Sequence, residues 1–134
     1  MNSFSKHFPS TIDVLPDIES FVSKTAKQLG LQGTKLEGFT LAASEAASNS
    51  IVHGNKMDFN KDITVELYLE SGTIVLKIFD KGCGFELEKI PDPTSPENIL
   101  KDSGRGIYIM RSFLTDLQYK FSEDGTTTFL FLKV

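Results

Sequence analysis

The chain has 134 residues, a length that fits one domain with a hydrophobic core of its own. Its hydrophobic content of 40%, charged content of 24% and net charge of −4 are ordinary for a globular protein and argue against the basic face that nucleic-acid binding needs. One cysteine excludes an internal disulfide, no apolar run approaches the roughly 18 residues of a membrane helix, and the first residues lack a signal-peptide pattern, so we expect a cytoplasmic protein without membrane contact.

The first third of the chain predicts one strand and two helices. Phe4, Lys6 and Phe8 alternate with polar residues until Pro9 ends the pattern, which is typical of a short strand. Apolar residues recur at helical spacing over 17–29, and the glycine that follows occupies a helix C-cap position. Thr34 and Glu37 have the spacing of a capping box and predict the start of a second helix, which Gly54 and Asn55 would end.

The rest of the chain predicts two β-hairpins, a long loop and one more helix. Residues 86–102 carry three prolines and little periodicity, and loops of that length usually form lids or binding loops. Helical spacing returns over 107–114. The strands of the hairpins are expected at 63–69, 74–78, 117–121 and 127–134. We therefore predict a single α+β domain over 1–134, a two-layer sandwich of a mixed, mostly antiparallel sheet with helices on one face.

The second predicted helix carries two polar side chains that could take part in catalysis or metal binding. Glu45 and Asn49 lie four residues apart, so they share a helix face in a stretch that is otherwise rich in alanine. A carboxylate can accept a proton from an attacking hydroxyl, and an amide oxygen can coordinate Mg²⁺ beside phosphates. The alternative is a solvated stripe. His53 continues the spacing, but a histidine favoured by the helix C-terminus is the simpler interpretation, and we assign it no catalysis.

Two glycine-containing turns add further candidate positions. Asp80 ends a predicted strand and is followed by Gly82 and Gly84, which permit close approach of a ligand to the backbone. A buried carboxylate there could accept a hydrogen bond from an exocyclic amine such as that of adenine, although a plain turn remains the alternative.

The second of these turns, Ser-Gly-Arg-Gly at 103–106, precedes the helix predicted from Ile107. Free backbone N–H groups at a helix start can bind an anion, and Arg105 can add a charge-assisted contact. Simple N-capping by Ser103 is the alternative. The turn matches neither the Walker A pattern nor the Rossmann glycine pattern.

Taken in order, these motifs resemble those of the GHKL ATPase superfamily. The N-box matches at residues 45–49 (EAASN), the first glycine box at 80–85 (DKGCGF) and the second at 104–107 (GRGI). The segment at 125–129 (GTTTF) resembles the strand whose threonine lies beside the adenine-binding aspartate. Within the superfamily, the stretch that leads into the second glycine box is similar to that of stand-alone bacterial anti-sigma factor serine kinases.

The resemblance implies a role for each matching residue. It makes Glu45 the base for an acceptor serine, Asn49 the Mg²⁺ ligand and Asp80 the residue that binds adenine. Thr126 or Thr127 would lie near the base, and three threonines in a row leave that register open. The remaining nucleotide contacts would come from Gly82, Gly84, Ser103, Gly104, Arg105, Gly106 and Ile107.

The same resemblance implies the activity and the partners. ATP·Mg²⁺ would be bound, and its γ-phosphoryl would pass to a serine of an anti-anti-sigma protein of the STAS type, leaving ADP. Release of the phosphorylated antagonist would free the kinase to hold a sigma factor. A homodimer is a further expectation. Two alternatives stay open: a non-catalytic module that switches partners with ATP or ADP as a bound ligand, and a plain ATP hydrolase.

Overall fold

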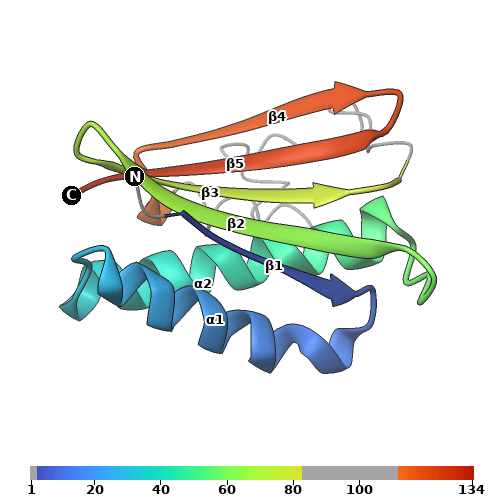
Figure 1. Cartoon of the computed structure of the whole chain (residues 1–134), viewed down its shortest axis with the longest axis horizontal. Helices are drawn as coiled ribbons and strands as arrows, with labels where there is room; N and C mark the ends of the chain where they lie inside the picture. Colours follow the sequence, from blue (N-terminus) through green and yellow to red (C-terminus); the bar gives the residue numbers. More distant parts are fainter. Residues whose placement is uncertain (1–2, 83–111) are drawn as a thin grey trace, which may run out of the picture.

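A five-stranded sheet with two long helices on one face makes up the part of the chain that the structure describes (Figure 1). The computed structural model describes residues 3–82 and 112–134. In space the strands follow the order β1-β2-β3-β5-β4, and each of the four pairings is antiparallel. Their bounds are β1 (Ser3–Pro9), β2 (Asp62–Glu70), β3 (Thr73–Asp80), β4 (Asp116–Ser122) and β5 (Gly125–Lys133). The predicted α+β sandwich is confirmed, but among the described strands the sheet is antiparallel throughout rather than mixed.

Both predicted helices are present. α1 (Leu15–Gln28) follows a 3₁₀ turn, η1 (Ile12–Val14), and α2 (Gly33–Asn49) continues without a break into a π-helical turn, η2 (Ser50–Gly54). At the end of α1, Gly30 has a φ of +109° and its N–H donates to the Lys27 carbonyl, while the Leu31 N–H donates to the Ala26 carbonyl. These two bonds form a Schellman motif, so the glycine expected to end this helix does so.

The predicted capping box at the start of α2 is wrong. The helix begins at Gly33 with Gln32 at the N-cap, and no side-chain hydrogen bond caps it. Gly33 has a φ of +63°, a left-handed conformation that glycine adopts without steric cost, and this residue turns the chain into the helix. Thr34 therefore lies within the first turn and is not the residue that precedes it.

The two described hairpins agree with the predicted pattern. Ser71 and Gly72, with φ values of +51° and +78°, join β2 to β3 as a two-residue turn. A second two-residue turn joins β4 to β5, which starts at Gly125 and so earlier than the predicted 127. The predicted loop over 86–102 lies outside the described residues. So does most of the helix predicted over 107–114, of which Ser112 and Phe113 are described and helical.

The core lies between the helices and the inner face of the sheet. Alternate residues of β2 and β3, such as Val65 and Leu76, are buried in the same core cluster as the alanines of α2. α2 contacts β3 and β5, and its small side chains let it approach these strands closely. Towards the carboxyl end of β3 the same inner face turns polar, with Asp80 and, on β5, Thr126 and Thr128 buried. Within residues 3–82 and 112–134, no helix has the length and apolarity needed to span a membrane.

Candidate functional site

Three elements meet at one end of the sandwich and surround the polar end of the core. The carboxyl end of β3, the amino end of β5 and the end of the α2–η2 helical run lie at the same end of the molecule (Figure 1). Asp80 is the last residue of β3, and it pairs with Thr126 across the β3–β5 ladder. Because side chains alternate along a strand, this pairing places both residues on the inner face, towards the helices.

Asp80 is a carboxylate without exposed surface. Its exposed fraction is 0%, and its Oδ1 accepts a hydrogen bond of 3.1 Å from the Gly82 N–H. Burial raises the pKa of Asp80 above its ordinary value of 3.8, and the hydrogen bond from the Gly82 N–H opposes that rise, as do the nearby dipoles of the Ser50 hydroxyl and the Thr126 backbone. A carboxylate is rarely buried without a counter-charge, so its placement here calls for a functional explanation.

The polar atoms around Asp80 are not satisfied by the described part of the protein. Asp80 Oδ2, Ser50 Oγ and Thr126 Oγ1 are buried, and none of them has a hydrogen-bond partner there. Each such atom costs free energy of about 1–3 kcal/mol unless something pairs with it. Three of them close together form a cradle with one carboxylate acceptor and two hydroxyls, which fits a ligand edge that carries both a donor and an acceptor.

Glycines bring the backbone close to this carboxylate. A Cβ atom on Gly54 would lie 2.5 Å from Asp80 Cγ and Oδ2, and a Cβ on Gly82 would overlap the Gly54 carbonyl oxygen. On the other side, a Cβ on Gly125 would overlap the Asp80 carbonyl oxygen. The end of η2, the turn after β3 and the start of β5 are therefore packed too closely for any side chain at these three positions.

The π-helical turn explains how the helix end reaches Asp80. In η2 the Asn55 N–H donates to the Ser50 carbonyl, five residues back, at 2.8 Å. The wider turn keeps Ser50 on the buried face and brings Gly54 against the carboxylate. π-Turns are rare and are frequent at functional sites, which agrees with this position.

Glu45 and Asn49 lie on α2 in the turns that lead to this cradle. Both are half-buried, and within the described residues neither is joined to another side chain by a hydrogen bond or an ion pair. No group of three or more His, Cys, Asp or Glu in that part of the chain could hold a metal ion. A cation near Asn49 would therefore rely on phosphate and water oxygens as well, which is usual for Mg²⁺.

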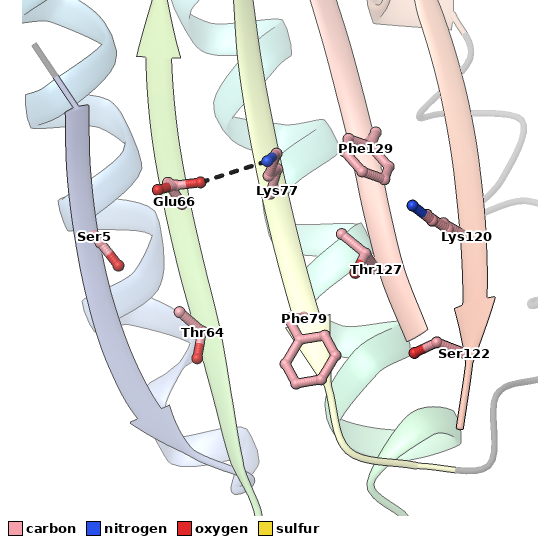
Figure 2. A pocket seen from close by; sticks show the side chains of 9 residues that line it. All are labelled: Ser5, Thr64, Glu66, Lys77, Phe79, Lys120, Ser122, Thr127 and Phe129. Atoms are coloured by element: carbon pink, nitrogen blue, oxygen red, sulfur yellow. Dashed lines mark ion pairs between the residues drawn. The ribbon is translucent and has the colours of Figure 1, made fainter. Parts of the chain in front are cut away.

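The two threonines that the sequence could not separate point in opposite directions. Thr126 is buried beside Asp80, whereas Thr127 lines a groove of about 470 Å³ on the open face of the sheet (Figure 2). In this groove Lys77 pairs with Glu66 at 3.8 Å and lies over the ring of Phe129. The structure thus brings Thr126, not Thr127, to the cradle.

Other predicted site residues are not placed. Gly84 and the turn Ser103, Gly104, Arg105, Gly106 and Ile107 lie outside the described residues. His53, to which we assign no catalysis, is exposed at the end of η2.

Sequence reasoning missed Ser50, Gly54 and Asn55 as parts of the site and treated Gly54 and Asn55 only as the helix end. The sole sequence clue was a serine on the apolar face of an alanine-rich helix.

Comparison with known proteins gives a consistent picture. A family model described as the histidine kinase-like ATPase domain matches residues 8–131. The chain is 31% identical to an anti-sigma F factor of Geobacillus stearothermophilus over 121 residues, which cover 84% of this chain and 82% of that protein. It is 25% identical to the serine-protein kinase RsbW of Listeria innocua over 108 residues, which cover 76% and 69% of the two chains.

Solved structures show the same fold. The RsbU and RsbW domains of a Mycobacterium tuberculosis protein match with a TM-score of 0.73 and 16% identity; the match covers 99% of this chain and 32% of the other, so this chain spans about a third of that longer one. A mycobacterial sensor histidine kinase, MprB, matches with a TM-score of 0.60 and 13% identity over 97% of each chain.

Proposed function

This chain belongs to the family of histidine kinase-like ATPase domains, and on that premise we propose that it binds ATP with Mg²⁺ and phosphorylates a serine of a small antagonist protein. The family match agrees with the resemblance that the three motifs indicated. In this proposal the antagonist is an anti-anti-sigma protein of the STAS type, and the chain holds a sigma factor when the antagonist has been phosphorylated and released.

The observation that carries the proposal is the buried cradle around Asp80. Adenine presents an exocyclic amine next to a ring nitrogen, so it offers one donor and one acceptor along the same edge. Asp80 Oδ2 can accept from the amine, and the Ser50 and Thr126 hydroxyls can donate to the ring nitrogen directly or through a water. Guanine carries a carbonyl oxygen in place of the amine, and two acceptors facing each other would repel.

The catalytic part of the proposal rests on Glu45 and Asn49. The hydroxyl of the acceptor serine loses its proton to the Glu45 carboxylate while its oxygen forms a bond to the γ-phosphorus. The bond between that phosphorus and the β–γ bridging oxygen breaks, and ADP leaves. Asn49 would hold Mg²⁺ through its amide oxygen, and the ion would neutralise charge on the phosphates.

The regulatory part is supported by the names of the relatives. One relative is an anti-sigma factor and another a serine-protein kinase, and a single protein that does both must exchange partners. Phosphorylation adds about −2 charge to the antagonist serine, which can break an interface that was formed around a neutral hydroxyl. The two partners would then compete for one protein, with the bound nucleotide biasing the outcome.

The test is transfer of labelled γ-phosphate to purified STAS-fold proteins from the organism that carries this chain. We expect one of them to be labelled, and its serine-to-alanine variant at the modified position to stay unlabelled. Adenine-selective binding without transfer to any of these proteins would contradict the kinase activity and favour the non-catalytic switch. Release of inorganic phosphate without a labelled protein would favour a plain hydrolase instead.

A further inference from the structure

We propose that Asn55 is a positioning residue that holds the turn after β3, and through it the Asp80 carboxylate, in the orientation that selects adenine. The inference deepens the proposed function and rests on it. No feature of the three motifs includes Asn55, which directly follows the π-helical turn.

Every polar group of Asn55 has a partner although the residue is only 1% exposed. Its backbone N–H donates to the Ser50 carbonyl at 2.8 Å, and its own carbonyl accepts from the Asp58 N–H at 3.0 Å. Its side-chain Nδ2 lies 2.7 Å from Ser10 Oγ, 3.3 Å from the Lys61 carbonyl and 3.2 Å from the Asp62 carbonyl. One side chain thus anchors the end of the helical run to the chain that leaves β1 and the chain that enters β2.

The remaining atom, Asn55 Oδ1, points to the site. It accepts a hydrogen bond of 2.8 Å from the Lys81 N–H, directly after Asp80. The next N–H along the chain, that of Gly82, donates to Asp80 Oδ1. Asn55 therefore fixes the Asp80–Lys81 peptide, the first of the two peptide units that lead from Asp80 to the glycine that orients its carboxylate.

A side-chain amide meets both demands of this position. Its NH₂ group faces carbonyl and hydroxyl oxygens, and its oxygen faces an N–H, so the orientation of the amide is set by its surroundings. An aspartate would keep the acceptor for Lys81 but would place a second acceptor against the two carbonyl oxygens. An alanine would lose both the NH₂ group and the oxygen of the amide, and would leave buried polar groups without partners.

The experiment compares Asn55→Ala with two matched variants. Ser10→Ala removes a contact from the anchoring side only, since Ser10 bonds to Asn55 Nδ2 and to the Lys61 carbonyl but not to Lys81. Asn55→Asp keeps the acceptor and weakens the same anchoring side. For each variant, titration calorimetry with ATP and GTP in the presence of Mg²⁺ gives the affinity ratio, the melting temperature reports stability, and amide hydrogen exchange of Lys81 and Gly82 reports the turn without nucleotide.

We expect Asn55→Ala to lower ATP affinity about tenfold, the usual effect of losing one buried hydrogen bond, and to lower the ATP-to-GTP ratio with it. Exchange at Lys81 and Gly82 should become faster. Ser10→Ala and Asn55→Asp should melt at lower temperature but keep most of the wild-type ratio and the slow exchange.

Two results would overturn the inference: an unchanged ratio and unchanged exchange in Asn55→Ala, or a loss of selectivity in Ser10→Ala as large as that in Asn55→Ala. If Asn55→Ala does not fold, loss of the ratio or of slow exchange in either of the other two variants overturns it. Wild-type protein that binds no nucleotide would contradict the proposed function instead, and the exchange measurements would still decide whether Asn55 holds the turn.

Discussion

At the scale of single residues, the site departs from the rules that govern the rest of the core. The inner face of the sheet is mostly apolar, but at the end of β3 it carries the buried Asp80 and Thr126, and Ser50 of η2 lies beside them. Within residues 3–82 and 112–134, one carboxylate oxygen and both hydroxyls of this cluster have no hydrogen-bond partner. Such a cluster costs stability in the protein alone and is worth keeping only if a ligand satisfies it. Replacing a member of this cluster should therefore stabilise the nucleotide-free protein and weaken its binding of nucleotide.

Replacing Asp80 should separate these two effects. Because burial raises its pKa, the folded protein retains the Asp80 proton to higher pH than the unfolded chain does. The stability contributed by this group is therefore present below the ordinary value and is lost as pH rises through the raised one.

We accordingly expect nucleotide-free Asp80→Asn to melt roughly 4 °C higher than wild type at pH 7, which corresponds to about 1 kcal/mol. Calorimetric scans from pH 7 to pH 4 should show the difference shrinking as Asp80 takes up its proton. With saturating ATP the order should reverse, since the single amide oxygen of the variant cannot accept from both the Gly82 N–H and the adenine amine. A variant that is less stable than wild type without nucleotide, yet binds ATP normally, would show that Asp80 is structural.

Glu45 gives the residue-scale prediction for catalysis. Glu45→Gln keeps the shape of the side chain and removes the base, so phosphotransfer should fall by about 10²–10⁴-fold. Affinity for ATP should stay within a few-fold, because among the described residues Glu45 makes no hydrogen bond to Asp80 or its neighbours and is half-buried on a separate turn of α2. Single-turnover transfer and calorimetry measure the two quantities. Equal loss of both would mean that Glu45 organises the site instead of taking the proton.

At the scale of elements, local patterns were sufficient for most of the fold but not for the details of the site. Alternation predicted the strands of the two hairpins because one face of the sheet is buried. The start of α2 was mispredicted, since a left-handed glycine replaced the side-chain cap. The choice between Thr126 and Thr127 depended on pairing of β5 with β3, which no local pattern contains.

The π-turn and Asn55 could not have been predicted in this way. The widened turn is set by contacts of the helix end with Asp80 and with the start of β2. The partners of Asn55 lie 45, 7, 6 and 26 residues away in the sequence. Helical periodicity relates residues only a few positions apart, so it cannot predict contacts at such separations. From the sequence, Asn55 therefore looked like the ordinary end of a helix.

The element-scale prediction concerns the close approach of η2 to β3. Gly54→Ala would place a methyl group 2.5 Å from the Asp80 carboxyl carbon, so the turn must move and ATP affinity should fall by about tenfold or more. Gly72→Ala is the matched control: it sits in the β2–β3 turn at the far end of the sheet, with open space around it and a φ of +78° (Figure 1). It should cost about 1 kcal/mol of stability and leave ATP affinity unchanged. Similar losses of affinity in both variants would contradict the proposed geometry.

At the scale of the whole molecule, the two faces of the sheet have different surroundings. The inner face holds the core and ends in the cradle, while the open face carries the Lys77–Glu66 pair and half-buried phenylalanines (Figure 2). The Lys77 ammonium group contacts Glu66 and the rings of Tyr68 and Phe129. Asp80 lies on the other face of the sheet. A nucleotide is therefore expected between the layers, at the end where α2, β3 and β5 meet.

Titration calorimetry of the wild-type protein with ATP, ADP and GTP, with and without Mg²⁺, tests the central claim most directly. The account predicts binding of ATP and ADP, assistance of ATP binding by Mg²⁺, and GTP affinity at least tenfold weaker because guanine presents an acceptor to Asp80. Equal affinity for ATP and GTP would contradict the assignment of the cradle to adenine. No binding of any of the three would contradict a nucleotide site at this end of the sheet.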